Sequence, residues 1–125
     1  MTNIEYWIKS SQDDLDTAKK LFNTKKYHHA LFFAHLALEK ILKAVYVNKK
    51  NEASPPIHDL IRLAEKSDLQ LSEESRLQLV EISTFNVAAR YDDYKFKFYK
   101  KATREYATKW MDISEKLINE FRRKI

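Results

Sequence analysis

Cationic and aromatic side chains alternate along one stretch of the chain, residues 90–104. This stretch contains six basic and two acidic residues, a surplus of four charges out of a net charge of +5 for the whole chain. Cations that meet phosphates beside rings that stack on bases are what a nucleotide or single-stranded nucleic acid site needs. In the alternative interpretation, the rings pack onto the rest of the domain and the lysines are only solvated. The binding residues expected from this tract are Arg90, Tyr91, Tyr94, Lys95 and Lys97.

A second group of charged residues interrupts a long apolar segment, residues 26–47. This group consists of Glu39, Lys40 and Lys43. Glu39 and Lys43 are four residues apart in the order that favours an intrahelical ion pair. Charged groups in a mostly buried helix usually have a partner or a functional role. An ordinary ion pair and a binding site are therefore both open for these residues.

The histidines predict neither a metal site nor a cofactor site. The four are His28, His29, His35 and His58. No glutamate precedes any of them by three residues, so the ligand spacing of a carboxylate di-metal bundle is absent. His58 and Asp59 follow two prolines, where Asp59 suits the first turn of a helix and His58 can tie the loop to the long apolar helix. Catalysis by His58 would need a poised neighbour, which the sequence does not identify.

Long helices must position all of these residues. The chain has no glycine, and its two prolines are adjacent at residues 55 and 56, so hairpin-rich sheets and glycine phosphate loops are excluded. Apolar periodicity predicts helices over residues 2–24 and 26–47, a short helix from the prolines to residue 64, and a helix over residues 72–89. Residues 91–96 lack a clean helical period, and a last helix is expected from about Tyr99. We therefore predict one domain, residues 1–125, that is an all-α, up-and-down bundle of four to five helices.

Composition and sequence pattern also bear on the cellular location of the protein. It has no cysteine, which removes disulfides and thiolate metal sites. No apolar run approaches the roughly 20 residues of a membrane span. The acidic residues that follow the N-terminus are unlike a signal peptide. We expect a cytoplasmic protein with no membrane partner.

Three motifs together resemble the HEPN domain family. Residues 27–44 are similar to the second helix of HEPN domains, with its Glu-Lys-x-x-Lys-Ala-like core beginning at Glu39. Ile57-His58-Asp59-Leu60, after the prolines, resembles the family's His-Asp-Leu segment. Ala89-Arg90-Tyr91-Asp92 resembles its Arg-Tyr-Pro segment, with Asp92 in place of the proline.

This resemblance implies a helical bundle that is usually a homodimer. It also implies association with a minimal nucleotidyltransferase, often as a prokaryotic toxin–antitoxin pair. Many HEPN proteins are metal-independent ribonucleases with an arginine followed four to six residues later by a histidine. Here the first arginine is Arg62 and the last histidine is His58, so no arginine precedes any histidine. The familiar ribonuclease motif is therefore absent, and no catalytic residue is assigned.

We expect a non-catalytic or degenerate HEPN domain that binds a nucleotide or RNA in one shared cleft. The alternatives are a ribonuclease with a non-standard site that brings Arg90 to His58, and a simple RNA-binding or structural module. The residues expected to line the cleft are Glu39, Lys40, Lys43, His58, Asp59, Arg90, Tyr91, Tyr94, Lys95 and Lys97.

Overall fold

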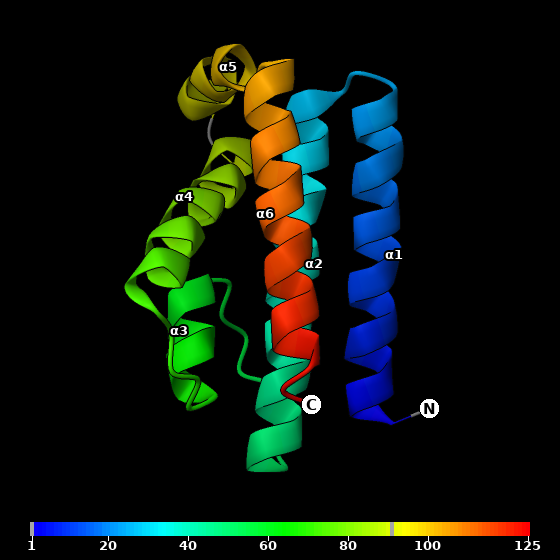
Figure 1. Cartoon of the computed structure of the whole chain (residues 1–125), viewed down its shortest axis with the longest axis vertical. Helices are drawn as coiled ribbons and strands as arrows, with labels where there is room; N and C mark the ends of the chain where they lie inside the picture. Colours follow the sequence, from blue (N-terminus) through cyan, green and yellow to red (C-terminus); the bar gives the residue numbers. More distant parts are fainter. Residues whose placement is uncertain (1, 91) are drawn as a thin grey trace.

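The computed structural model describes residues 2–90 and 92–125, and their side chains except those of residues 89, 90 and 92. Over this part of the chain the fold is all-α, as predicted, and it contains six helices rather than four or five. Their bounds are α1 (Asn3–Asn23), α2 (Tyr27–Lys50), α3 (Leu60–Lys66), α4 (Glu73–Arg90), α5 (Asp92–Lys101) and α6 (Arg104–Arg122). In Figure 1, α1, α2 and α6 run side by side, and α5 lies across the end of the bundle where α2 and α6 begin.

Side-chain caps begin α1, α3, α4 and α6, whereas the N-cap of α2 makes no such hydrogen bond, and residues other than glycine turn the chain at several ends. Thr2 and Glu5 form the predicted capping box of α1. Because glycine is absent, three other residues adopt the left-handed conformation at turns: Lys25, Asn51 and Asp68, with φ of 64°, 53° and 58°. Asn and Asp tolerate this conformation better than Lys does.

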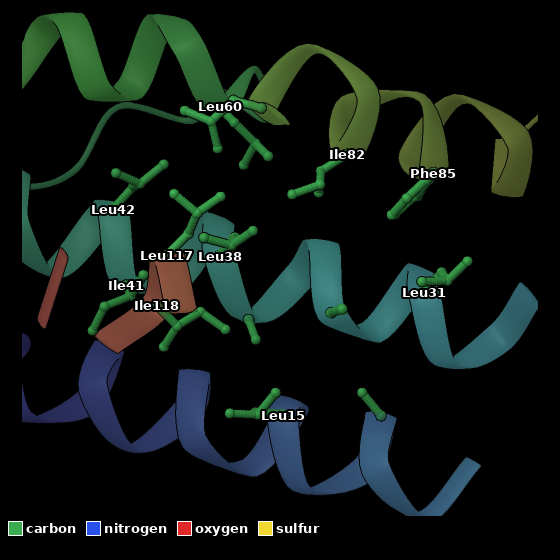
Figure 2. Close-up of a cluster of buried hydrophobic side chains, with 14 of the residues drawn as sticks. Leu15, Leu31, Leu38, Ile41, Leu42, Leu60, Ile82, Phe85, Leu117 and Ile118 are labelled. Atoms are coloured by element: carbon green, nitrogen blue, oxygen red, sulfur yellow. The ribbon is translucent and has the colours of Figure 1, made fainter. Parts of the chain in front are cut away.

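The helix α2 is the central element of the bundle. Within the described residues it contacts each of the other five helices, which agrees with its apolar character on nearly every side. Figure 2 shows the resulting core, in which side chains of α2 interdigitate with those of its neighbours. The fully buried members include Leu31 and Leu38 of α2, Leu60 of α3 and Phe85 of α4. This core fixes the position of α2 relative to α3 and α4, and so positions the polar residues of α2.

Three predictions about helix boundaries were wrong. The tract after residue 91 is the regular helix α5, and the last helix begins at Arg104 with Thr103 as its N-cap. In α5, Phe98 is the buried aromatic ring, packed 5.2 Å from the ring centroid of Phe85. One buried ring in a charged segment produces no helical period in the sequence. The helix α3 begins after Asp59, so the prolines precede it rather than forming its first turn.

The described residues contain no helix that is both long and apolar enough to cross a bilayer.

Candidate functional site

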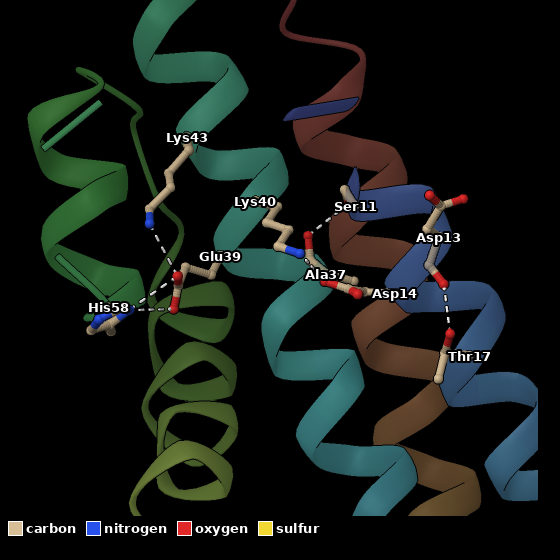
Figure 3. A network of polar contacts seen from close by, with 9 residues as sticks. All are labelled: Ser11, Asp13, Asp14, Thr17, Ala37, Glu39, Lys40, Lys43 and His58. Atoms are coloured by element: carbon tan, nitrogen blue, oxygen red, sulfur yellow. Dashed lines mark hydrogen bonds and ion pairs between the residues drawn. The ribbon is translucent and has the colours of Figure 1, made fainter. Parts of the chain in front are cut away.

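Glu39 is the centre of a polar cluster between α2 and the loop that precedes α3. Its carboxylate accepts a hydrogen bond from Lys43 Nζ at 3.1 Å, and both of its oxygens lie 3.1 Å from His58 Nδ1. Glu39 and Lys43 are buried, whereas the side chain of His58 is 51% exposed. Figure 3 shows the three side chains converging from two segments of the chain. We call Glu39, Lys43 and His58 the α2–α3 cluster.

The Glu39 carboxylate orients the histidine ring. A carboxylate accepts hydrogen bonds, so Nδ1 of His58 is the donor in this contact. Lys43 Nζ also lies 5.1 Å from the ring centroid of Trp7 of α1, a cation–π contact. The cluster therefore ties α1, α2 and the loop before α3 together around one buried carboxylate. The predicted Glu39–Lys43 pair is present, and so is the tie from His58 to α2.

Lys40 and Asp59 have other partners. Lys40 follows Glu39 by about 100° around the helix axis, and its Nζ pairs with Asp14 of α1 at 2.7 Å. Figure 3 shows Lys40 pointing to α1, away from His58. Asp59 caps α3 by accepting hydrogen bonds from the backbone N–H groups of Ile61 and Arg62. The structure therefore pairs Lys40 with α1 rather than with the α2–α3 cluster and places Asp59 in a helix cap, and the binding roles of both residues stay predictions.

Arg90 and Tyr91 are also predicted site residues, but their side chains lie outside the described part of the structure. The backbone of Arg90 forms the last residue of α4. The binding roles of both residues, and the alternative ribonuclease site that joins Arg90 to His58, stay predictions.

Basic and aromatic side chains of α5 contribute to the lining of two cavities, and Phe98 lines both of them. The first, which we call the inner cavity, has a volume of about 250 Å³ and lies between α2, α4 and α5. Its lining is mostly aromatic, with three nitrogen-bearing side chains among the rings. The lining residues are His28, His29, Phe32, Phe33, Phe85, Ala88, Lys95 and Phe98.

The inner cavity is electropositive. The pKa of His28 is lowered from its ordinary value of 6.5, first because the ring is partly buried and then because His29, Lys95 and Lys26 surround it with like charge. The ring of His28 lies 3.9 Å from that of His29 and 5.1 Å from that of Tyr99, between centroids. An anion bound among these groups would lie beside positive charge. It would also raise the pKa of the His28 ring, because it stabilises the protonated form.

The second cavity, which we call the outer cavity, has a volume of about 240 Å³ and shares Ala88 and Phe98 with the inner one. It is lined by residues of α4 and α5, namely Thr84, Val87, Ala88, Tyr94, Lys97, Phe98 and Lys101. The predicted residues of α5 are thus divided: Lys95 lines the inner cavity, whereas Tyr94 and Lys97 line the outer one.

Glu81 of α4 holds the end of α5 in place. Its carboxylate pairs with Lys101 Nζ at 2.8 Å and accepts a hydrogen bond from the hydroxyl of Tyr106 of α6. Partial burial works to raise the pKa of Glu81, but the hydrogen bonds from Lys101 and Tyr106 outweigh it and lower the pKa below its ordinary value. Burial, and then Glu81 itself, raise the pKa of Tyr106, which keeps its proton and donates.

The inner cavity and the α2–α3 cluster are separate sites. His28 and Glu39 share a face of α2, but their positions in the sequence place them roughly 16 Å apart along the helix axis. Sequence reasoning did not assign His28, His29, Phe32 or Phe33 to a site. The sequence does show two histidines followed by two phenylalanines near the start of α2. These residues indicate a cavity only once the position of α5 is known, because α5 forms part of its lining.

Comparison with known proteins identifies one family and one similar structure. The family model described as HEPN domain matches residues 4–124. A solved structure, the crystal structure of TT1696 from Thermus thermophilus, aligns with a TM-score of 0.84 at 19% sequence identity and covers 100% of both chains. At this identity the structural likeness concerns the fold alone. No curated protein matches the chain.

Proposed function

Because the chain belongs to the HEPN domain family, we propose that it is a non-catalytic or degenerate HEPN domain that binds a nucleotide or RNA. We further propose that it acts as a cytoplasmic homodimer and partner of a minimal nucleotidyltransferase, in a toxin–antitoxin-like pair. The part of this proposal that concerns the partner is supported by the family's common association with such enzymes.

The inner cavity is the observation that carries the ligand part of the proposal. Its phenylalanine rings offer apolar faces on which a base can stack, and Lys95, His28 and His29 supply positive charge beside them. Its volume of about 250 Å³ is below that of typical ligand pockets, which measure about 300–1,000 Å³. The cavity therefore suits one base with its phosphate, and a longer RNA would continue outside it along α5.

The sequence supports a binding role over cleavage. Since no histidine follows any arginine, the family's ribonuclease motif cannot form in this chain. The α2–α3 cluster contains a histidine oriented by a carboxylate, but Lys43 also engages that carboxylate. The cluster is accounted for by its structural role in tying the loop to α2.

Titration with ATP and with a fluorescent single-stranded oligoadenylate tests ligand binding. We expect Lys95→Ala to weaken binding about tenfold, equal to about 1.4 kcal/mol, because one charge-assisted contact to phosphate is lost. The affinity of the RNA should also fall steeply with salt, in proportion to the phosphates that are neutralised. Lys9→Ala, which removes an exposed lysine of α1, is the matched control and should leave the affinity unchanged.

Two results would count against the ligand proposal: equal effects of the Lys95 and Lys9 substitutions, or an affinity that does not respond to salt. Co-elution of the chain with a co-expressed minimal nucleotidyltransferase tests the partner separately.

A further inference from the structure

A third cavity lies beside the inner cavity, at the end of the bundle where α2 and α6 begin. We call it the end cavity, and its volume is about 340 Å³. Its lining comes from the turn between α1 and α2, the start of α2, the end of α5 and the N-cap of α6. Figure 1 shows these segments at the same end of the molecule. The polar and aromatic lining residues are Lys25, Tyr27, His28, Tyr99, Lys100 and Thr103.

His28 connects the end cavity to the inner cavity. It lines both of them, and its partly buried ring makes a T-shaped contact with the ring of Tyr99, at 5.1 Å between centroids. The outer cavity instead shares Ala88 and Phe98 with the inner one, and both of these side chains are buried. A ligand can extend over an accessible ring, so a strand that leaves the inner cavity over His28 enters the end cavity.

The cations of the end cavity are available to an anion. Among the described residues, neither Lys25 nor Lys100 forms an ion pair with a carboxylate. Lys100 Nζ lies 4.7 Å from the ring centroid of Phe96, a contact that leaves its charge uncompensated. In the outer cavity, by contrast, Lys101 pairs with Glu81 at 2.8 Å. Uncompensated like charges that line one cavity attract phosphate.

The two cavities follow one another along α5. Lys95 of the inner cavity and Lys100 of the end cavity are five residues apart, roughly 7.5 Å along the helix axis. Tyr99, beside Lys100, is 61% exposed and offers a ring face on which a base can stack. Each cavity thus combines aromatic rings with cations, which is the combination that binds one nucleotide of a single strand.

We propose that the ligand is single-stranded RNA, with neighbouring nucleotides in the inner and end cavities and the phosphodiester that joins them at His28. Lys95 binds the phosphate of the nucleotide in the inner cavity, and Lys25 and Lys100 flank the next nucleotide, whose base stacks on Tyr99. A mononucleotide fills one cavity and leaves these last contacts unused. The inference rests on the proposed function, since it requires a nucleotide in the inner cavity.

Titration with adenosine monophosphate and with the 5′-phosphorylated dinucleotide pApA tests the second position. We expect pApA to bind about tenfold more tightly, because the second nucleotide adds a stacked base and a charge-assisted phosphate contact. Tyr99→Ala and Lys100→Ala should each reduce this tenfold ratio of dissociation constants to about threefold. Lys95→Ala should weaken the binding of both ligands by the same factor and keep the ratio.

Tyr6→Ala is the matched control for Tyr99→Ala. Tyr6 is a similarly exposed tyrosine, 53% against 61%, and Figure 1 shows the start of α1 at the opposite end of the bundle. Its substitution should leave both dissociation constants unchanged. Because Tyr99 and Lys100 are exposed, their variants should fold, and circular dichroism checks this.

The outcomes separate this inference from the proposed function. Equal affinities for the two ligands, both weakened by Lys95→Ala, overturn the second position and keep the nucleotide in the inner cavity. A tenfold ratio that neither Tyr99→Ala nor Lys100→Ala reduces also overturns the role of the end cavity. Failure of both ligands to bind the wild-type chain overturns the inference together with the ligand part of the proposed function.

Discussion

Glu39 is the side chain whose charge matters most to the interior of the bundle. Its carboxylate is only 6% exposed, and it compensates the buried ammonium group of Lys43 at 3.1 Å. Removing one member of such a pair leaves the other charge buried without compensation, which costs far more than the pair contributes as a whole. The carboxylate also holds His58, and through it the loop before α3.

We predict that Glu39→Gln lowers the free energy of unfolding by about 3 kcal/mol, because the ammonium group of Lys43 then lies buried beside a neutral amide. Urea denaturation measures this change. The double variant Glu39→Gln with Lys43→Met removes both charges and should recover most of the loss. Glu115→Gln, in the exposed pair with Lys19, should cost less than about 1 kcal/mol. A single variant as stable as the double one would contradict a buried, charged pair.

Sequence spacing predicted some of these residue contacts and not others. The Glu39–Lys43 pair follows from a separation of four residues on a helix. The cap at Asp59 and the tie from His58 follow from their position at the start of a helix. By contrast, the pairing of Lys40 with Asp14 depends on the rotation of α1 against α2, which apolar periodicity does not specify. This is why Lys40 was expected beside Glu39 and His58, whereas in the structure it pairs with α1.

At the scale of elements, α5 decides where a ligand can bind. Its sequence is dominated by charge, and the helix is held by one buried ring, Phe98, and by the contacts of Lys101 with Glu81. Neither feature produces a period in the sequence, so the existence of α5 could not be predicted from its own residues. The long helices α1, α2 and α6 were predicted because each buries a regular apolar face.

We predict that Glu81→Gln loosens α5 and lowers the free energy of unfolding by about 1–2 kcal/mol, since charge-assisted hydrogen bonds from Lys101 and Tyr106 are weakened. Amide hydrogen exchange should become faster in α5 than in α1, and thermal unfolding gives the overall loss. Glu120→Gln, at an exposed position of α6, is the control and should change stability by less than about 0.5 kcal/mol.

The same contact has a pH signature. The folded-state pKa of Glu81 is lowered from 4.5, so the unfolded chain binds the proton more tightly than the folded chain does. The stabilisation by Glu81 is therefore fully present above pH 4.5 and is lost as the pH falls through the folded-state pKa. The difference in stability between wild type and Glu81→Gln should shrink below pH 4.5. A difference that stays constant down to pH 3 would contradict the role of this carboxylate.

For the whole molecule, an all-α bundle follows from the absence of glycine and from the apolar character of α2 on nearly every side. Two features could not be predicted in this way. The inner cavity forms because α5 folds back over the start of α2, bringing Lys95 to His28 across more than sixty residues of sequence. The end cavity appears only once the end of α5 is placed against the turn between α1 and α2.

The central claim is that the inner cavity receives the phosphate of a nucleotide or RNA, and the pKa of the His28 ring reports on this directly. In the free protein that pKa is lowered from 6.5 by burial and by neighbouring positive charge. A bound phosphate stabilises the imidazolium form, so its binding raises the pKa and becomes tighter as the pH falls from 7 toward the pKa of the free ring.

The deciding measurement is an NMR titration of the histidine rings against pH, with and without saturating ATP, in which His28→Gln identifies the resonance. We predict that ATP raises the pKa of His28 and shifts the NMR signals of Lys95 and Phe98. The NMR signals of His58 should not move when ATP is added. A His28 pKa that saturating ATP leaves unaltered, or shifts confined to His58, would contradict the assignment of the ligand to the inner cavity.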